Sequence, residues 1–440
     1  MSRTLIRNTT IVTVDTTNTI VHGDLLIEDG RFATVGGTAP GAADQELDGT
    51  GLIAIPGLIQ THLHLCQTLF RSLADDVALL DWLQRFIWPL EAAHTPETLY
   101  ASAALGVAEL LKGGTTAILD MATLRHTDAI FEACRDLGIR ATIGKVLMDH
   151  PRSPDVLRDT TANALDESVL LLERWHDREA GRLRYAFAPR FAVSCTGALL
   201  REVADLARRY NVRVHTHASE NLDEVAIVEA EHGLRNIAYL DSIGLSGPHV
   251  CVAHCVHVDR HEIELLARTG THVLHCPSSN CKLASGIAPI PEMLAQGVRV
   301  SLGADGAACN NNLDAFQEMR LAALIHKPRF GPQALPAQDV LRMATRDGAA
   351  ALGLEDRIGS IEVGKQADLV LLDLDQVHVQ PASDHNLISR IVYATHAGDV
   401  RHVFVGGRQV VRDGALLTDD ETRIVKQANQ ALRQMTGAIG

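Results

Sequence analysis

The spacing of hydrophobic residues changes twice along the chain. Over residues 1–55, apolar and β-branched residues alternate or cluster in short runs, and Asp29-Gly30 predicts a tight turn between two of them. From about residue 56 to 360, short apolar runs alternate with longer stretches of helical spacing. From about 361 the strand pattern returns, with a hairpin predicted at Gly406-Gly407, and residues 420–435 predict a polar helix. The pattern therefore predicts short strands near both ends of the chain and alternating strands and helices between them.

The middle region predicts a barrel of parallel strands. Its candidate strands are 57–62, 115–119, 141–146, 184–188, 212–216, 250–253, 271–274 and 298–302, and its clearest helical segments are 96–111, 198–209, 259–268 and 313–325. Strands that alternate with helices favour a (β/α)8 barrel, and no GxGxxG follows the first strand to support a dinucleotide-binding fold. We expect an α/β protein with a TIM-like barrel over 56–360 and a small β-sandwich domain built from both termini, 1–55 plus 361–440.

Composition restricts the partners of this protein. The chain has 440 residues, 46% of them hydrophobic and 21% charged, with a formal net charge of −14. That charge argues against nucleic acid or an anionic membrane as a partner, because both need a basic face. Eight cysteines without a CxxC pair, and the lack of a secretory or membrane-spanning apolar run, favour reduced thiols and a cytoplasmic location. Because symmetric homo-oligomers are common, we expect one here.

Histidines and a carboxylate follow the predicted strands. His62 and His64 end the first strand of the barrel and point to one side of it, since side chains two residues apart share a face. His217, His254 and Asp305 lie at the ends of strands five, six and eight. Functional residues of such barrels collect at the carboxyl ends of the strands. We therefore predict one divalent metal held by His62, His64, a histidine of strand five and Asp305, with His217 nearer the strand end than His215.

Two further residues suit acid–base chemistry. A metal of this kind yields hydroxide at neutral pH by lowering the pKa of its water. Glu220, three residues after His217, is placed to move a proton to a substrate ring, and His254 to orient the water or accept its proton. Glu220 could instead be a carboxylate at a helix N-terminus, and His254 a buried core histidine.

The motifs resemble the amidohydrolase superfamily, in its branch of purine and triazine aminohydrolases. The resemblance is carried by His62-Leu63-His64, by His217-Ala218-Ser219-Glu220, by residues 253–257 and 275–280, and by Gly303-Ala304-Asp305-Gly306-Ala307. It implies a single metal on His62, His64, His217 and Asp305, with Glu220 and His254 as the acid–base pair and Asp305 also a proton acceptor. Zinc is the expected metal, and iron also suits these ligands. The expected reaction is attack of the activated hydroxide on an amino-bearing ring carbon, with release of ammonia.

The substrate is a small N-heterocycle whose identity the motifs leave open. The segment Trp88-Pro89-Leu90-Glu91 resembles the one by which nucleoside deaminases of this branch hold ribose hydroxyls through a glutamate. Gln67, Lys145 and Arg190 stand where guanine deaminases carry similar residues, and Gln and Arg can hydrogen-bond a base. We expect an adenosine-type nucleoside (5′-deoxyadenosine, methylthioadenosine or S-adenosylhomocysteine), with guanine or a related pterin as one alternative and a triazine such as N-ethylammeline as another.

Two remaining possibilities differ in kind. A non-catalytic scaffold would be expected to have lost ligands, whereas all of them are present here. A cyclic-amide hydrolase would need two metals bridged by a carbamylated lysine, for which Lys145 is the candidate. We expect Lys145 to be a structural or substrate-facing ammonium instead.

Overall fold

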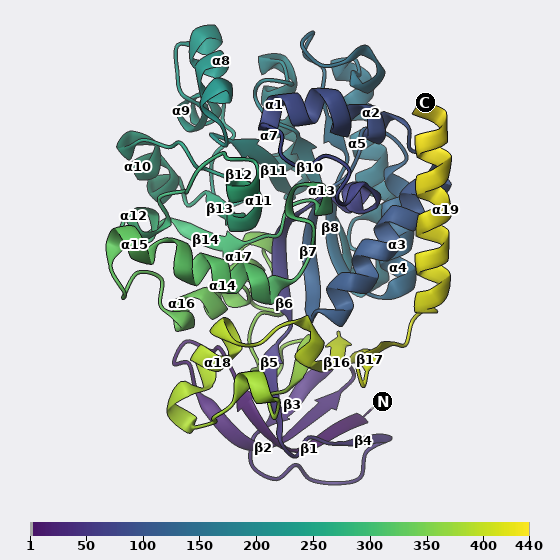
Figure 1. The fold of residues 1–440 in the computed structure, drawn as a ribbon, viewed down its shortest axis with the longest axis vertical. Coiled ribbons are helices and arrows are strands. Elements are labelled where there is room, and N and C mark those ends of the chain that lie inside the picture. Colours follow the sequence, from purple (N-terminus) through teal and green to yellow (C-terminus); the bar gives the residue numbers. More distant parts are fainter. Residues whose placement is uncertain (1–2, 440) are drawn as a thin grey trace.

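The computed structural model describes residues 3–439 and places a barrel above a smaller sheet (Figure 1). The barrel strands are all parallel and run in the order β14-β13-β12-β11-β10-β8-β7-β6. Their bounds are β6 (Leu58–Leu63), β7 (Thr115–Met121), β8 (Arg140–Gly144), β10 (Leu183–Pro189), β11 (Arg213–Ala218), β12 (Val250–His254), β13 (His272–His275) and β14 (Arg299–Leu302), with the short β9 (Val146–Leu147) beside β10. The predicted fold class is confirmed.

One isolated backbone bridge among the described residues joins the first strand to the segment after the last, and the Thr61 hydroxyl also donates to the Leu302 carbonyl at 2.9 Å. Leu63 and Asp305 form an isolated parallel pair, and the Asp305 amide donates to the His62 carbonyl at 3.0 Å. All residues of β6 and β7 are buried. Strands covered on both faces show continuous apolar runs rather than alternation, which is the pattern the sequence carries in this region.

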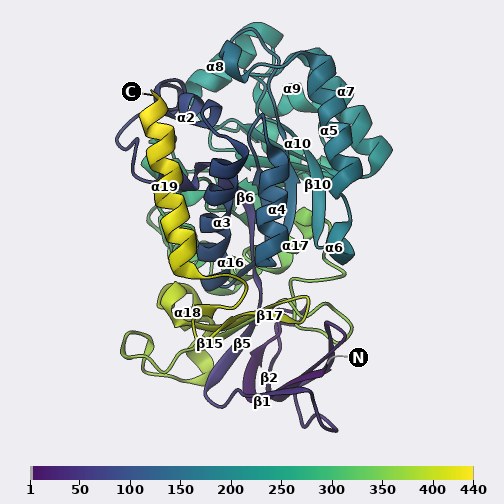
Figure 2. The same cartoon turned by 90° about the vertical axis from the view of Figure 1, so that its right-hand side faces the viewer.

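Helices surround the barrel (Figure 2). Several begin at capping residues: Thr95 caps α3 and Asp259 caps α10, each through a capping box. The four predicted helical segments correspond to α3 (Pro96–Lys112), α7 (Gly197–Tyr210), α10 (Arg260–Thr269) and α14 (Ala315–Ile325). The other helices are α1 (Leu79–Trp82), α2 (Trp88–Ala92), α4 (Thr127–Leu137), α5 (Thr161–Trp175), α6 (Arg178–Gly181), α8 (Leu222–His232), α9 (Asn236–Ser242), α11 (Pro277–Lys282), α12 (Ile290–Ala295), α13 (Ala307–Asn310), α15 (Lys327–Phe330), α16 (Ala337–Met343), α17 (Arg346–Leu352) and α18 (Leu387–Tyr393).

Short turns of 3-10 or π type complete the connections. The π turn η2 (Leu83–Ile87) continues α1 into α2 above the barrel. The 3-10 turns are η1 (Leu65–Phe70), η3 (Asp155–Leu157), η4 (Val377–Val379), η5 (Asp384–Asn386) and η6 (Ala397–Asp399).

Strands from both ends of the chain form one mixed nine-stranded sheet below the barrel. Its order is β18-β17-β16-β15-β5-β1-β2-β3, with β4 paired to β1. The bounds are β1 (Arg3–Val12), β2 (Ile20–Glu28), β3 (Arg31–Val35), β4 (Gln45–Asp48), β5 (Leu52–Pro56), β15 (Leu369–Asp373), β16 (Val400–Val405), β17 (Arg408–Arg412) and β18 (Ala415–Leu416). One buried cluster contains Ile6, Leu25, Phe32, Leu371 and Phe404, so residues from both termini share one core. The domain boundaries at 55/56 and 360/361 stay a prediction.

The two turns expected from sequence lie side by side in this sheet. Asp29-Gly30 joins β2 to β3, and Gly406-Gly407 joins β16 to β17. A Cβ on Gly30 would lie 2.5 Å from the Gly406 carbonyl oxygen, so only glycine fits there.

The last helix, α19 (Glu421–Ile439), packs along α3 on the outside of the barrel (Figure 1). It is the polar helix predicted over 420–435. Among residues 3–439, no helix has the length and apolar character needed to cross a bilayer.

Candidate metal centre

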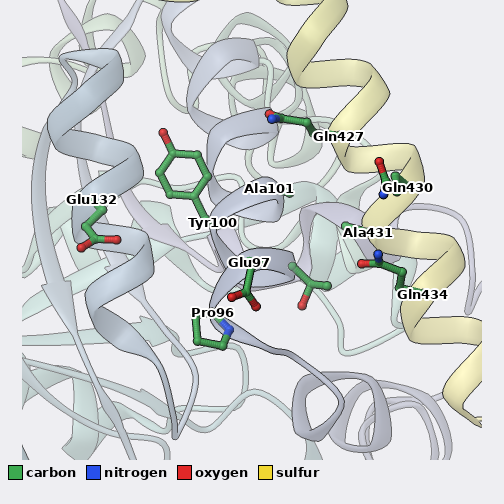
Figure 3. A pocket seen from close by; sticks show the side chains of 10 residues that line it. Pro96, Glu97, Tyr100, Ala101, Glu132, Gln427, Gln430, Ala431 and Gln434 are labelled. Carbon is green, nitrogen blue, oxygen red and sulfur yellow. The ribbon is translucent and has the colours of Figure 1, made fainter.

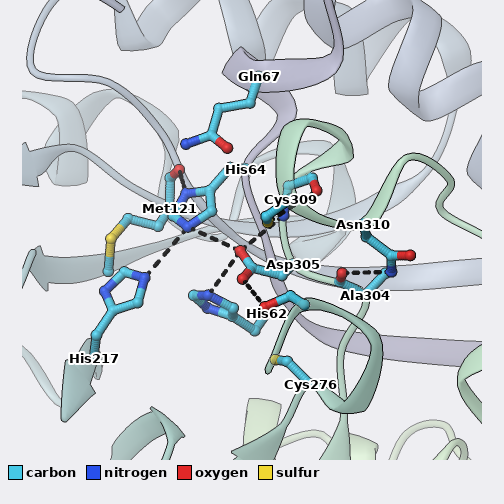
Figure 4. A network of polar contacts seen from close by, with 12 residues as sticks. His62, His64, Gln67, Met121, His217, Cys276, Ala304, Asp305, Cys309 and Asn310 are labelled. Carbon is cyan, nitrogen blue, oxygen red and sulfur yellow. Dashed lines mark hydrogen bonds and ion pairs between the residues drawn. The ribbon is translucent and has the colours of Figure 1, made fainter. Parts of the chain in front are cut away.

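The carboxyl ends of three barrel strands bring four side chains together. His62 lies in β6 and His64 follows it, His217 lies in β11, and Asp305 follows β14 (Figure 4). Asp305 Oδ1 lies 3.3 Å from Nε2 of His62 and 3.3 Å from Nε2 of His64. His217 Nε2 lies 3.3 Å from His64 Nε2. These are the residues in which the sequence predicted a metal site.

The donor atoms fit a bound cation. A carbonyl oxygen can only accept, so His64 Nδ1 donates to Met121 at 2.9 Å and His217 Nδ1 donates to Arg190 at 2.7 Å. The Nε2 atoms of both neutral rings then face each other with lone pairs, an arrangement that needs positive charge between them. His62 Nε2 is also buried without a hydrogen-bond partner among the described residues. Two ligands about 2.0–2.1 Å from a tetrahedral metal lie about 3.4 Å apart, close to the separations here.

Burial keeps these imidazoles neutral. It lowers the pKa of His62 to about 4 and the pKa of His217 well below its ordinary value. For Asp305, burial alone would raise the pKa, but His62, His64 and His254 hold the pKa of this carboxyl well below its usual range. Neutral imidazoles and an ionised carboxylate are the forms that bind metals.

Neighbouring groups fix the orientation of this donor set. His62 Nδ1 lies 2.7 Å from Nε2 of His215, and Ser279 Oγ donates to Asp305 Oδ2 at 2.6 Å. Gly303 packs against the His62 backbone so closely that a Cβ would lie 2.8 Å from the His62 amide nitrogen. Partners of this kind orient metal ligands and are worth about 10–100-fold in metal affinity or activity.

The backbone at this end of the barrel is strained. Ser219, His254, Cys255 and Asp305 all have positive φ angles, between 49° and 72°, although none is glycine. Each such residue costs on the order of 1–3 kcal/mol and persists only where surrounding contacts hold it. The strain occurs where β11, β12 and β14 deliver their side chains.

Glu220 and His254 lie next to the donor set. His254 Nε2 lies 3.6 Å from Glu220 Oε2 and 4.0 Å from Asp305 Oδ2. Burial, together with the Asp305 charge, raises the pKa of Glu220. Burial alone would lower the pKa of His254, but the Glu220 and Asp305 carboxylates raise it. Asn280 Oδ1 holds His254 Nδ1 at 2.8 Å, which leaves Nε2 directed at the two carboxylates.

A buried glutamate holds the turn that presents Glu220. Glu224 accepts the amides of Ser219 and Glu220 at 3.2 and 2.8 Å, and also the Asn236 side-chain amide. Burial raises the pKa of Glu224 to about 7. Glu224 therefore stabilises a turn that contains the left-handed Ser219.

A cavity opens onto this cluster. Its lining combines cluster residues with apolar side chains from the segment above the barrel: His64, Gln67, Leu79, Trp82, Leu83, Arg190, Phe191, His217, Glu220, His254, Leu283 and Asp305. Two buried polar atoms of this lining, Gln67 Oε1 and Trp82 Nε1, have no hydrogen-bond partner among the described residues. A ligand in the cavity could supply one donor and one acceptor to them.

The predicted substrate-facing residues divide into two groups. Gln67 and Arg190 line the cavity, and both bond Glu91: Gln67 Nε2 donates at 2.9 Å and Arg190 Nη1 at 2.8 Å. Trp88 and Lys145 are buried but do not line this cavity. The Lys145 ammonium pairs with Asp159 at 2.9 Å and Glu167 at 3.4 Å. The predicted contact of Trp88 and Lys145 with substrate stays a prediction.

Sequence reasoning did not single out several residues of the site. A helical segment far from any strand end contributes Trp82, Leu79 and Leu83 to the cavity lining. The rule that functional residues lie at the carboxyl ends of barrel strands therefore does not predict them. Asn280 and Ser279 belong to the motif 275–280, from which no role for them could be deduced. Glu224 could have been suspected as a second acidic residue in the first turn of α8.

Another hollow of about 560 Å³ lies between α3, α4 and α19 (Figure 3). Its lining includes Glu97, Tyr100, Glu132, Gln427 and Gln434, and it contains no histidine or cysteine. It shares no residue with the cavity at the metal-binding cluster.

Known proteins resemble this chain over nearly its whole length. The amidohydrolase family model matches residues 53–410. A 5-methylthioadenosine/S-adenosylhomocysteine deaminase of Desulforudis audaxviator is 41% identical, covering 99% of this chain and 100% of that protein. A 5′-deoxyadenosine deaminase of Methanothermobacter thermautotrophicus is 42% identical over 95% of this chain and 96% of its own length. The crystal structure of a Xanthomonas campestris adenosine deaminase with bound zinc superposes with a TM-score of 0.91 at 32% identity, covering 99% of both chains.

The family model matches residues 53–410, and relatives 41% and 42% identical cover nearly the whole chain. These two findings establish the family. The resemblance deduced from the motifs is thereby confirmed, and the buried histidine and aspartate cluster is suited to a divalent metal. The chain belongs to the amidohydrolase family, and within it is a deaminase, an aminohydrolase acting on a C–N bond of a cyclic amidine.

Proposed function

We propose that this enzyme is a zinc-dependent deaminase of adenosine-type nucleosides, acting on 5′-deoxyadenosine, methylthioadenosine or S-adenosylhomocysteine. The observation that carries the proposal is the convergence of His62, His64, His217 and Asp305 with Glu220 and His254 at one buried cavity. The activities named for its full-length relatives support this choice of substrates.

His62, His64, His217 and Asp305 would hold one metal ion per chain. Zinc is favoured over iron because the similar adenosine deaminase structure contains it. When bound, the ion would supply hydroxide near neutral pH by lowering the pKa of its water.

Glu220 and His254 then move protons. Burial raises the pKa of Glu220, which favours the protonated form of its carboxyl, and Glu220 lines the cavity. Glu220 therefore donates to the ring nitrogen beside the attacked carbon, which makes that carbon more electrophilic. His254, held through Nδ1 by Asn280, accepts a proton at Nε2 with Asp305 beside it. The proton returned to the amino group lets ammonia leave.

Gln67, Glu91, Arg190 and Trp82 would position the substrate. Glu91 is 4% exposed and accepts from both Gln67 and Arg190, so a ribose hydroxyl that reaches it has to share the carboxylate with the Arg190 guanidinium. Trp82 Nε1 and Gln67 Oε1, which have no hydrogen-bond partner among the described residues, belong to two residues that line this cavity.

One observation favours guanine as a second candidate substrate. Arg190 and Gln67 line the cavity, and a guanidinium with an amide can recognise a ring carbonyl and its neighbouring nitrogen. Glu91 would then serve to orient Arg190 rather than to hold a sugar.

An ammonia-release assay on purified protein of known metal content tests the proposal. The panel contains the three nucleosides above, adenosine, guanine and amino- and chlorotriazines. We expect kcat/KM to be at least about tenfold higher for one of the three nucleosides than for guanine. Activity on guanine alone would replace the nucleoside proposal with the guanine one, and chloride or alkylamine release would favour a triazine hydrolase. An inactive, metal-loaded protein would point to a scaffold. Location in the cytoplasm and a homo-oligomeric state stay predictions.

A further inference from the structure

A cavity of about 490 Å³ lies at the opposite end of the barrel, where the barrel meets the small sheet. Figure 2 shows α6 at this level, beside the lower end of β10 and above the sheet. The lining comes from the two glycine turns of the sheet, from the starts of barrel strands and from the α6 segment. It shares no residue with the cavity at the metal-binding cluster.

Arginine dominates the lining of this cavity. Five arginines contribute to it, whereas the acidic lining residues are Asp29 and Glu179; the arginines are Arg31, Arg140, Arg182, Arg357 and Arg408. Asp368 neutralises Arg140 in a buried bidentate pair with distances of 2.9 and 2.8 Å. The cavity therefore keeps an excess of positive charge in a chain whose formal net charge is −14.

Fixed contacts hold some of these guanidiniums in place. Arg182 Nη1 donates to the carbonyls of Cys134 and Ile139 at 2.9 and 2.6 Å. Arg357 Nη2 donates to the Ala180 carbonyl at 3.3 Å. Burial lowers the pKa of Arg182, the Glu179 carboxylate 3.6 Å away raises it, and the charges of Arg140 and Arg408 lower it. Arg140, Arg182 and Arg408 line one cavity, so their like charges repel one another, and an anion between them would relieve that repulsion.

The segment beside the cavity is strained. Asp177, Glu179 and Ala180 all have left-handed φ angles of 52–56°, followed by Gly181 at 77°. Glu179 and Ala180 both line the cavity. Runs of non-glycine residues in this region are costly and are held by surrounding contacts, often at ligand-binding segments.

We propose that this cavity binds a phosphate-bearing anion at the junction of the barrel and the small sheet. Arginine presents planar pairs of N–H donors that match phosphate oxygens, and it binds them more specifically than lysine does. The volume lies in the range of small-molecule sites, about 300–1,000 Å³. Since Arg31 and Arg408 belong to the sheet and Arg182 to the barrel, a bound anion ties the two together and stabilises the folded protein.

Calorimetric titration and thermal melting of the metal-loaded enzyme test this proposal. Inorganic phosphate is one probe and ribose 5-phosphate the other, each compared with chloride at the same ionic strength. At a concentration about a hundredfold above Kd, phosphate should raise Tm by about 2–5 °C beyond the chloride control. A tighter Kd for ribose 5-phosphate would identify a phosphorylated small molecule as the occupant, and equal values would identify free phosphate.

Variants locate the binding to this cavity. Arg357→Ala and Arg408→Ala should each weaken binding at least about tenfold, because each removes charge-assisted hydrogen bonds. Arg260→Ala is the matched control, since Arg260 is exposed on α10 and, among the described residues, forms its ion pair with Glu264 at 3.0 Å. Deaminase activity and metal content of all three variants verify folding. If Arg357→Ala is unstable, Arg357→Lys, which keeps the charge but loses the planar donor pair, replaces it. No heat and no Tm rise beyond chloride, or unchanged binding in both cavity variants, would overturn the proposal.

Discussion

The two ends of the barrel strands carry opposite kinds of chemistry. At the carboxyl ends, imidazoles and carboxylates surround a buried cavity, and Arg190 is the arginine among its lining residues. At the amino ends, arginines bind carbonyl oxygens and Asp368, and they join the barrel to the small sheet. The same strands thus supply reactive groups at one end and structural ion pairs at the other. Substitutions at the carboxyl ends of the strands should therefore reduce catalysis, and substitutions at the amino ends should lower the free energy of unfolding.

Removing a proposed metal ligand should have the largest effect on the catalytic end. Asp305→Asn and His217→Ala should lower metal content well below one per chain and reduce turnover by more than about 10³-fold. His261→Ala is the control, because His261 is exposed on α10. Metal analysis beside steady-state kinetics makes the measurement. Full activity of either ligand variant with bound metal would remove that residue from the ligand set.

Replacing the proposed proton donor, Glu220, should separate the chemical step from metal binding. Glu220→Gln keeps the size of the side chain but cannot give up a proton, so kcat should fall by about 10²–10⁴ while the metal stays bound. Glu264→Gln, on the exposed face of α10, should leave kcat unchanged. Survival of turnover in Glu220→Gln would show that another group protonates the ring.

Breaking the buried ion pair at the other end should affect stability instead. Arg140→Ala leaves the Asp368 carboxylate buried and without its bidentate partner, so the free energy of unfolding should fall by about 3–5 kcal/mol. The kcat of the remaining folded, metal-loaded enzyme should not change. Urea denaturation followed by circular dichroism gives the first quantity. A loss below about 1 kcal/mol would mean that the pair contributes no more than a surface ion pair does.

Loosening the turn that carries Glu220 should have a smaller effect on catalysis. In Glu224→Gln, an N–H group replaces one of the oxygens that accept the Ser219 and Glu220 amides. We expect kcat to fall about tenfold with little change in KM, because Glu224 positions the proposed proton donor Glu220 and does not itself line the cavity. A change confined to KM, or an equal loss of metal, would contradict this positioning role.

A last effect concerns pH-dependent stability near the catalytic end. Burial raises the pKa of Asp120 from 3.8 to about 7, and Oδ2 has no partner among the described residues. The folded state then binds a proton that the unfolded state has lost, so the Asp120 contribution to stability is present below about pH 4 and declines as pH rises to about 7. Asp120→Asn keeps the acceptor for the Leu65 amide and should raise the free energy of unfolding at pH 8 by roughly 1–4 kcal/mol. An unchanged pH profile of unfolding in this variant would refute the assignment.

Local patterns were sufficient for much of this molecule. The apolar runs of the middle region predicted the strands because parallel strands are buried on both faces, and His62-x-His64 predicted a shared direction because strand side chains alternate. Asp305 could be placed because strand eight of a barrel lies beside strand one. These deductions needed only periodicity and the closure of a ring.

Long-range contacts were outside the reach of such patterns. Arg190 and Glu91 are 99 residues apart, so nothing local signals that they form an ion pair. Trp82 enters the cavity from a connecting helical segment whose path depends on packing. The arginines of the cavity at the amino ends of the strands come from segments far apart in the sequence, such as those of Arg31 and Arg408. They come together only when strands from both termini join in one sheet.

The isolated backbone bridge between Leu63 and Asp305 bears on the order in which the metal site can form during synthesis of the chain. It joins the two edges of the barrel sheet, and the proposed ligands lie on both sides of it. His62 and His64 lie at the end of β6, Asp305 follows β14, and His217 lies in β11. No fragment that lacks either edge carries the complete donor set. The chain therefore has to be synthesised past Asp305 before it can retain its metal, and amide hydrogen exchange along β6 and β14 should slow when metal is added to the apoprotein.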